Sequence, residues 1–173
     1  GTVKKDPTTL CATSEESFAF LDGLFAALLP NFTSRRFNIG CDETFDLLSP
    51  RARSAEAVRE LGAGRVYLGF LKRVAAISRK YGKRPMFWGD IILEHPEYIS
   101  ELPEDVICLN WGYEADHPFE EQAAAIGHFA RKEVVGSFAK VGLLALGAEG
   151  EGEGGCSVHI LKCFFLLLCL LHD

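Results

Sequence analysis

This 173-residue sequence lacks the features that mark several common classes of protein. Its six cysteines form no C-x-x-C pair, which excludes zinc-ribbon and thioredoxin-type sites. Lysine and arginine number 18 against 24 aspartates and glutamates, so the chain has no basic excess of the kind that nucleic-acid binding requires. The histidines show no spacing typical of metal ligands. We therefore expect no nucleic-acid partner and no histidine metal site.

Long apolar runs are also missing. The longest one spans 160–171, is interrupted by Lys162, and falls short of the ~20 residues that a membrane helix needs. The length of the chain fits one domain and is well below the ~250 residues of a complete (β/α)8 barrel. We expect a single folded unit and no membrane span.

Amphipathic helices alternate with short apolar strands along residues 13–132. Helices are predicted from a capping box at 13–16 to Pro30, from about Gly64 to Gly82, and over 118–132. Strands are predicted at 35–40, 85–90 and 106–111, and loops at 46–63 and 94–104. Continuous apolar strands that are separated by helices predict an α/β fold with a parallel sheet, either an open doubly wound sheet or a piece of a barrel.

The composition changes after residue 133. The segment 142–155 contains six glycines and alternates glycine with glutamate, a pattern that cannot bury enough apolar surface to become ordered. We expect residues 1–133 to form the fold and residues 134–173 to be a tail outside it, for example the product of a frame shift or read-through. The alternative is that the apolar run at 160–171 forms a small helix packed on the body.

Polar and aromatic side chains follow each of the three predicted strands. Asp42 and Glu43 end the first strand, Trp88-Gly89-Asp90 the second, and the run from Asn110 to Glu114 the third. Active sites of parallel α/β folds lie at the carboxyl ends of their strands. Finding such groups at three successive strand ends therefore indicates one shared site.

The residue types at these strand ends are typical of a carbohydrate site. Taken alone, Asp42 and Glu43 would more often cap a helix or face solvent, and Trp88 and Trp111 would more often be core residues. Taken together, indoles can stack on the apolar faces of sugars, and glycosidic cleavage needs a positioned acid. Both acids can reach one site only if the strand ends there, which Gly40 would permit.

Four stretches of the sequence resemble glycoside hydrolase family 20, the β-N-acetylhexosaminidases. Gly40-Cys41-Asp42-Glu43 is similar to the Gly-x-Asp-Glu signature of that family. The resemblance continues through 64–67, through 84–90 with its Trp-Gly-Asp sequence, and through 109–114 to about residue 130. It covers roughly three quarters of the chain, and the order of the motifs along the strands makes it fairly specific.

The resemblance implies a partial TIM barrel that comprises about strands four to six. It implies that Glu43 acts as general acid and base, and that Asp42 orients the 2-acetamido group of the substrate in substrate-assisted retaining catalysis. Further substrate-binding candidates are Trp88, Asp90, Trp111, Tyr113 and Glu114. The implied partner is a carbohydrate with a terminal N-acetylhexosamine, and the mechanism requires no cofactor and no metal.

The sequence also departs from the family. The family takes further sugar ligands from the first three and the last two strands of its barrel, and these 173 residues contain none of those strands. We therefore expect the isolated chain to be inactive or marginally folded. A second interpretation is a non-catalytic carbohydrate-binding or structural remnant, in which Asp42 and Glu43 only cap the following segment. A third, an unrelated metal-dependent phosphohydrolase, would need more Asp or His at the strand ends.

Overall fold

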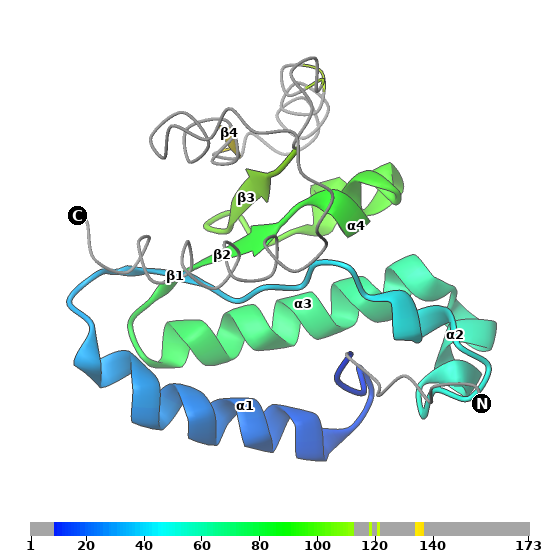
Figure 1. Cartoon of the computed structure of the whole chain (residues 1–173), viewed down its shortest axis with the longest axis horizontal. Helices are drawn as coiled ribbons and strands as arrows, with labels where there is room; N and C mark the ends of the chain where they lie inside the picture. The colour runs from blue at the N-terminus through cyan, green and yellow to red at the C-terminus, as the bar shows by residue number, and fades with distance from the viewer. Residues whose placement is uncertain (1–8, 113–117, 119–120, 122–133, 137–173) are drawn as a thin grey trace, which may run out of the picture.

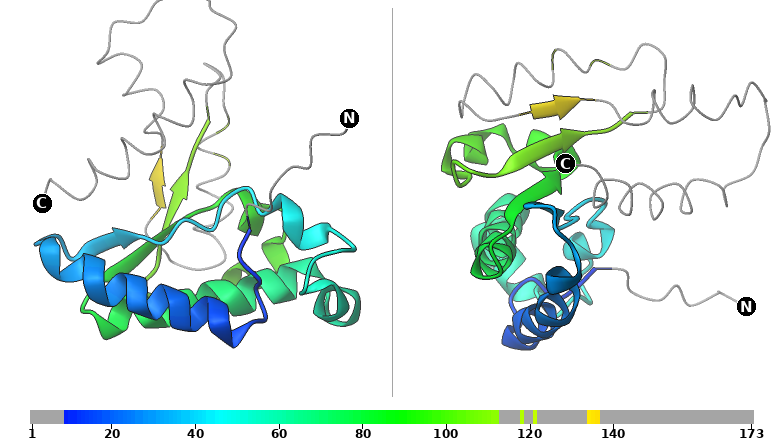
Figure 2. Two further views of the ribbon diagram at one scale, coloured as in Figure 1. Left: turned by 60° about the horizontal axis from the view of Figure 1, so that its bottom comes forward. Right: turned by 90° about the vertical axis from the view of Figure 1, so that its left-hand side faces the viewer.

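One parallel β-sheet organises the described part of the chain (Figures 1 and 2). The structure is a computed structural model, and it describes residues 9–112, 118, 121 and 134–136. The strands are β1 (Arg36–Asn38), β2 (Arg84–Trp88), β3 (Ile107–Asn110) and β4 (Val134–Gly136). They lie side by side in the order β1-β2-β3-β4, and every neighbouring pair is parallel. The predicted parallel sheet is confirmed.

The connections between the strands contain α-helices and short 3-10 helices. The α-helices are α1 (Glu15–Leu28), α2 (Ala55–Leu61), α3 (Ala63–Lys80) and α4 (Asp90–Leu93). The 3-10 helices are η1 (Leu29–Asn31), η2 (Phe45–Leu48) and η3 (Pro96–Glu101). Figure 2 shows α1 and α3 together against one face of the sheet. The strands and helices therefore form two layers.

Helix α3 is the main support of the sheet. Its buried residues recur at helical spacing, among them Leu68, Leu71 and Ala75, and they form one core cluster with Phe87 of β2. The helix ends beside Gly82, whose φ of 73° suits a residue without a side chain. This is the predicted stop. The apolar stripe of α3 thus fixes the distance between helix and sheet.

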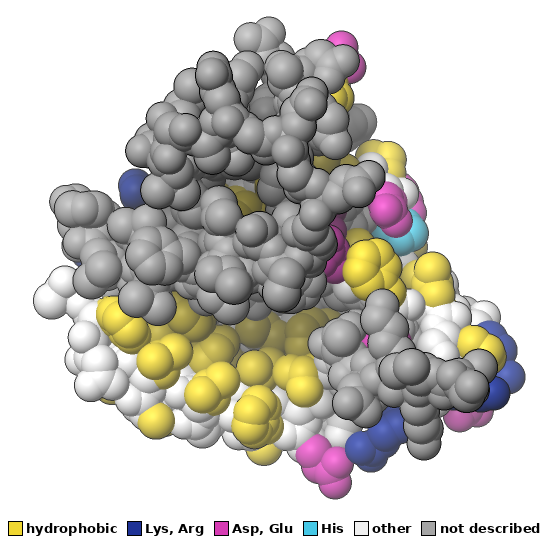
Figure 3. Space-filling view, in the orientation of Figure 1, with side chains coloured by type: hydrophobic (Ala, Val, Ile, Leu, Met, Phe, Trp, Pro, Cys, Tyr) yellow, Lys and Arg dark blue, Asp and Glu magenta, His cyan; other side chains and the backbone are white. Residues whose placement is uncertain are grey.

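Helix α1 packs beside α3 and contacts the sheet at its edge strand β1. Phe25 makes an edge-to-face contact with Phe37 of β1, with ring centroids 4.9 Å apart. Three further side chains, Phe20, Leu24 and Leu28, recur every four residues on its exposed side. Hydrophobic side chains gather along the lower part of the molecule in Figure 3. Helix α1 therefore has apolar side chains on its exposed side as well as on its packed side.

Several boundaries differ from the sequence predictions. The capping box is wrong, because α1 begins after Ser14 and that residue makes no side-chain capping hydrogen bond. The segment 46–63 is not a loop, since it contains α2 and most of η2, and the predicted loop at 94–104 contains η3. Asp90 lies in α4 rather than on a strand. Most of the helix predicted at 118–132 lies outside the described residues.

The strand β4 falls within the segment that the sequence assigned to a tail. Val134–Gly136 pairs with β3 in parallel, with Cys108 opposite Val134. Residues 137–173 lie outside the described part, so the proposed boundary at residue 133 stays a prediction. Among the described residues, no helix combines the length and the apolar character needed to cross a membrane.

Candidate active site at the carboxyl ends of the strands

An irregular turn follows β1 and contains both predicted catalytic carboxylates. The strand ends at Asn38, and Gly40, Cys41 and Glu43 then adopt positive φ angles of 75°, 71° and 47°. For residues with a side chain, the left-handed conformation costs roughly 1–2 kcal/mol each. The turn replaces the alternation of a regular strand, in which neighbouring side chains point to opposite faces. The sequence predicted that the strand would end before the two acids and that Gly40 would permit a turn, and β1 does end at Asn38.

The first half of the turn is held by strand neighbours. The backbone N–H of Gly40 donates to Oδ1 of Asn38 at 2.8 Å, and the backbone N–H of Trp88 donates to the Gly40 carbonyl at 3.0 Å. Asn38 is buried with 7% of its surface exposed. These contacts fix the end of β1 against the end of β2.

The second half of the turn is held by two side chains that come from other elements. The Tyr67 hydroxyl in α3 donates to the carbonyl of Cys41 at 3.0 Å. Oδ2 of Asp90, the first residue of α4, accepts the backbone N–H of Glu43 at 3.0 Å. The structure therefore places Asp90 directly beside Asp42 and Glu43, although it is 47 residues from Glu43 in the sequence.

Burial raises the pKa of the Asp90 carboxyl above its ordinary value. The Glu43 N–H lowers this pKa, while the negative charge of Asp42 raises it further. Among the described residues, Oδ1 of Asp90 is buried and has no hydrogen-bond partner. Crowded carboxylates and a raised pKa are features that cluster at functional sites.

Close packing beneath Asp90 explains the glycine that precedes it. A Cβ atom on Gly89 would lie 2.4 Å from Sγ of Cys108 and 2.9 Å from Oδ1 of Asn110. The Gly89 N–H donates to the carbonyl of Leu109 at 2.8 Å, which keeps β2 and β3 together beyond their last paired residues. Asn110 is 2% exposed, and its Nδ2 has no partner among the described residues. The space under α4 admits no side chain at position 89.

Thiol and phenol groups below the turn are protonated near neutral pH. Burial raises the pKa of Cys41 to about 12, and the charges of Asp42 and Asp90 add to this rise. Burial likewise raises the pKa of Cys108 to about 12, with the charge of Asp90 contributing. The pKa of Tyr67 lies well above its ordinary value, chiefly because of burial. Tyr67 therefore keeps the proton that it donates to Cys41.

The two tryptophans flank the site from β2 and β3. Trp88 is half-buried and packs against Met86, Ile107 and Leu109, on the face of the sheet opposite to α3. Trp111 follows β3 directly and is also half-buried. Tyr113 and Glu114, the remaining predicted site residues, lie outside the described residues. The structure thus brings five of the seven predicted residues to the carboxyl ends of β1, β2 and β3.

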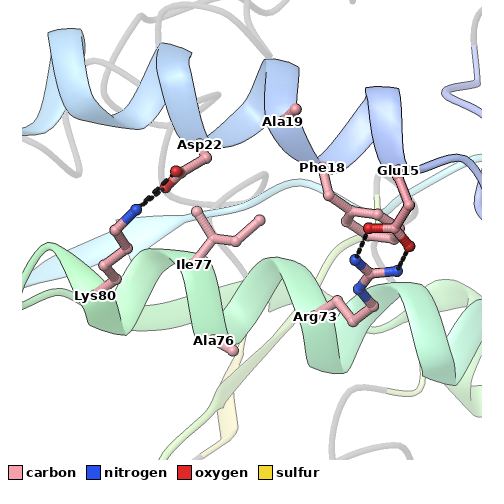
Figure 4. Close-up of a pocket in the computed structure, with 8 residues that line it drawn as sticks. All are labelled: Glu15, Phe18, Ala19, Asp22, Arg73, Ala76, Ile77 and Lys80. Atoms are coloured by element: carbon pink, nitrogen blue, oxygen red, sulfur yellow. Dashed lines mark hydrogen bonds and ion pairs between the residues drawn. The ribbon is translucent and has the colours of Figure 1, made fainter.

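A groove elsewhere on the molecule offers no comparable chemistry. It measures about 580 Å³ and lies between α1 and α3 (Figure 4). Its charged side chains are paired, since Arg73 binds Glu15 with two contacts of 2.6 Å and Lys80 binds Asp22 at 2.7 Å. The described residues also contain no group of three or more metal-binding side chains. The strand ends therefore remain the candidate site.

Tyr67 and Asn110 are the site residues that the sequence analysis missed. Tyr67 lies on the apolar face of α3, where a buried hydroxyl needs a hydrogen-bond partner, and that requirement was the available signal. Asn110 was noted only as part of a strand end. Its amide is an unusual group to find at 2% exposure.

The comparison with protein families decides where this chain belongs. Residues 1–132 match the family described as glycosyl hydrolase family 20, catalytic domain. The chain belongs to this family. Glycosyl hydrolase family 20 catalytic domains are TIM barrels, and the parallel sheet with its helices is a part of that fold. No curated protein sequence matches the chain significantly.

Solved structures of glycosyl hydrolase family 20 share the fold. The chain is similar to the Flavobacterium johnsoniae chitobiase, with a TM-score of 0.58, 19% identity, and coverage of 75% of this chain and 20% of that one. A β-N-acetylhexosaminidase from Bacteroides fragilis matches with a TM-score of 0.57 and 18% identity, and the match covers 77% of this chain and 26% of that one. A mutant β-hexosaminidase from Streptomyces plicatus, in complex with the product GlcNAc, matches with a TM-score of 0.52 and 22% identity. This match covers 79% of this chain and 23% of that one. The chain therefore spans about a quarter or less of their length.

Proposed function

We propose that this chain is part of the catalytic barrel of an exo-acting β-N-acetylhexosaminidase. The enzyme would remove terminal N-acetyl-β-hexosamine residues from carbohydrates with retention of configuration. In this proposal β1, β2 and β3 are the fourth, fifth and sixth strands of the barrel. Membership of glycosyl hydrolase family 20 supports the reaction class. The family's solved structures include a complex with GlcNAc, which supports the class of substrate.

Glu43 carries the proton transfers of the proposed mechanism. It protonates the glycosidic oxygen as the bond to the anomeric carbon breaks, and it later takes a proton from the water that attacks that carbon. The acetamido oxygen of the substrate bonds to the anomeric carbon as the glycosidic bond breaks, so no covalent bond to the protein forms. The attacking water then displaces this oxygen and restores the acetamido group. Asp42 accepts the acetamido N–H and stabilises the positive charge of the resulting oxazolinium ion.

The other candidate residues bind the sugar in this proposal. Trp88 and Trp111 supply the aromatic walls against which the sugar ring and the acetamido methyl group pack. Tyr113 and Glu114 complete the substrate-binding residues of the proposal. Asp90, the third candidate from the sequence, contacts the backbone of Glu43 in the structure. No metal ion or organic cofactor takes part in any of these steps.

The observation that carries the proposal is the turn after β1. Its positive φ angles at Cys41 and Glu43 end the strand geometry where both acids must reach one site. Oδ2 of Asp90 at 3.0 Å from the Glu43 nitrogen ties the end of β2 to the same place. An Asp-Glu pair that merely faced solvent would not need a strained backbone held by a half-buried carboxylate and a buried phenol.

The proposal is tested by assaying two forms of the protein with 4-nitrophenyl N-acetyl-β-D-glucosaminide. One form is the 173-residue chain, and the other adds the residues that flank it in its reading frame. We expect the longer form to release 4-nitrophenol and Glu43→Gln to lower kcat by about 10²–10⁴-fold. Glu60→Gln, at an exposed position on α2, is the matched control and should leave kcat unchanged.

We expect the 173-residue chain alone to release no more 4-nitrophenol than its Glu43→Gln variant. Release that disappears in Glu43→Gln would contradict the proposed inactivity of the chain. A longer form that folds, as circular dichroism shows, and still releases nothing would contradict the enzyme assignment. That outcome would favour the remnant, in which Asp42 and Glu43 only cap the following segment.

A further inference from the structure

The backbone of Glu43 adopts a conformation that needs support from its surroundings. Its φ is 47°, and Cys41 two residues before it has a φ of 71°. Side-chain-bearing residues keep such conformations only where neighbouring contacts over-determine them. The carbonyl of Glu43 accepts the N–H of Phe45 at 2.8 Å, which closes the turn locally. The support of its N–H must come from elsewhere.

Two side chains supply this support from different elements. Oδ2 of Asp90 accepts the Glu43 N–H at 3.0 Å, and the Tyr67 hydroxyl donates to the Cys41 carbonyl at 3.0 Å. One contact holds a donor of the turn and the other holds an acceptor. The two contacts lie on either side of Asp42, so the backbone around the acidic pair is held at both ends.

Neither side chain is free to move. Tyr67 is 2% exposed and belongs to the core cluster that joins α3 to the sheet. Asp90 begins α4 directly after Gly89, and the absence of a side chain at that glycine lets the backbone lie against Cys108 and Asn110. The carboxylate of Asp90 is a charged acceptor, and such acceptors make stronger hydrogen bonds than neutral ones. Both supports are therefore anchored to the sheet.

We propose that Tyr67 and Asp90 are positioning residues that hold Glu43 in its left-handed conformation and so set the direction of its carboxyl group. This inference rests on the proposed function for the meaning of Glu43, and it assigns to Asp90 a role through the backbone of Glu43 in place of direct contact with the sugar. Neither residue exchanges protons with substrate in this role.

The test is amide hydrogen exchange at Glu43, measured by NMR on the ¹⁵N-labelled 173-residue chain. Asp90→Ala removes the acceptor and should speed exchange at the Glu43 N–H roughly tenfold or more. Asp90→Asn keeps an acceptor oxygen and should stay within about threefold of the parent chain. Tyr67→Phe loosens the turn from its other side and should speed exchange at Glu43 severalfold.

Two matched variants and one internal reference control for general destabilisation. Asp105→Ala removes an aspartate beside Arg79, at the amino end of β3, and Tyr81→Phe removes a hydroxyl that binds Asp22. Both should leave exchange at Glu43 unchanged. The amide of Leu109 in β3 should keep its protection in all variants.

Three results would overturn the proposal. They are unchanged exchange at Glu43 in Asp90→Ala, equally fast exchange in Asp90→Asn and Asp90→Ala, and a parallel rise at Leu109. If Asp90→Ala does not fold, Asp90→Asn and Tyr67→Phe decide. Protection in the former with loss in the latter supports the proposal, and any other pairing overturns it.

The experiment separates this inference from the proposed function, because hydrogen exchange needs no activity. In the longer form of the protein, Asp90→Ala should lower kcat with little change in KM, since the residue acts on the catalytic group and not on substrate binding. Asp90→Asn should restore most of the activity. Exchange results as expected, with no hydrolysis by any form, would contradict the enzyme assignment and leave the positioning of Glu43 supported.

Discussion

Charges at the amino ends of the strands are paired, whereas charges at the carboxyl ends are crowded together. At the amino end of β2, Lys83 is 9% exposed and donates to the carbonyls of Phe32 and Ser34, the first at 2.7 Å. At the amino end of β3, Arg79 binds Asp105 through two hydrogen bonds. Lys83 thus meets two carbonyl oxygens, and Arg79 meets a group of opposite charge.

The carboxyl ends show the reverse arrangement. Asp42, Glu43 and Asp90 lie together, and the Glu43 N–H donates to Oδ2 of Asp90. Two side-chain atoms, Oδ1 of Asp90 and Nδ2 of Asn110, are buried without partners among the described residues. In barrels of this type the amino ends stabilise the fold and the carboxyl ends hold the site. The contrast fits the proposal that the carboxyl ends give up stability for chemistry.

Thiol reactivity should give the largest effect. Cys11 lies in the segment before α1, and although burial alone would raise its pKa, hydrogen bonds from Thr13 and Ser14 bring it below 9.0. The pKa of Cys41 is about 12. The thiolate is the reactive form, and at pH 8 a much larger fraction of Cys11 than of Cys41 is thiolate. The more basic Cys41 thiolate is more nucleophilic, which offsets part of this difference. Iodoacetamide at pH 8 should therefore modify Cys11 on the order of a hundredfold faster than Cys41.

Peptide mass spectrometry over time measures these two rates. Asp42→Asn should speed the reaction of Cys41, because the charge of Asp42 contributes to its raised pKa. A rate at Cys41 that levels off near pH 9 would contradict its raised pKa, which burial chiefly causes. An unchanged rate in Asp42→Asn would contradict the crowding of negative charge at the carboxyl ends.

Overpacking below the site should give the next largest effect. Gly89→Ala places a methyl group 2.4 Å from Sγ of Cys108, and we expect a loss of about 3 kcal/mol in the free energy of unfolding. Gly69→Ala is the control, since it lies in α3 with nothing within 4 Å and should stabilise the chain by up to about 1 kcal/mol. Urea unfolding measures both. Equal effects of the two substitutions would contradict the tight packing under α4.

Removing the buried cation at the amino ends should cost less. Lys83→Met leaves the carbonyls of Phe32 and Ser34 without their donor, and we expect a loss of about 2 kcal/mol. Lys72→Met removes an exposed partner of Glu101 and should change the stability by less than about 0.5 kcal/mol. If both variants unfold at the urea concentration of the parent chain, the amino ends do not stabilise the fold in this way.

The smallest effect concerns the pair Arg79–Asp105. Hydrogen bonds from Arg79 lower the pKa of Asp105. The pair therefore stabilises the fold above the ordinary pKa of 3.8, and this stabilisation is lost as the pH falls through the lower pKa of the folded state. Because Asp105 is 46% exposed, Asp105→Asn should cost no more than about 1 kcal/mol at pH 7. The difference from the parent chain should disappear in acid. Thermal unfolding between pH 7 and pH 2 measures it.

The sequence allowed the sheet and its main helices to be predicted because their patterns are local. The apolar spacing of α3 and the continuous apolar character of β2 and β3 require no knowledge of partners. Helix α2 was missed because none of its residues is buried, so its sequence has no apolar stripe. Strand β4 was missed because three residues are too few to show a period.

The candidate site was predicted only where residues adjoin strand ends. Asp42 and Glu43 follow β1, and Trp88 ends β2, so the order of elements places them. Tyr67 reaches its partner Cys41 across 26 residues, and Asp90 reaches Glu43 across 47. No sequence pattern announces such pairings, because they depend on how closely α3 and α4 pack against the sheet.

The strand order has a consequence for how the chain folds. Paired residues of β1 and β2 are 48 positions apart in the sequence, as Arg36 and Arg84 are. The separation is 21 positions between β2 and β3 (Met86 with Ile107) and 26 between β3 and β4 (Cys108 with Val134). Closing the first loop costs about 0.7 kcal/mol more entropy than closing the second. We expect β2 and β3 to join early and β1 to dock late. Shortening the side chain of Phe87 should then slow folding, and shortening the side chain of Phe37 should mainly speed unfolding. The acidic turn after β1 would thus be among the last parts of the sheet to take shape.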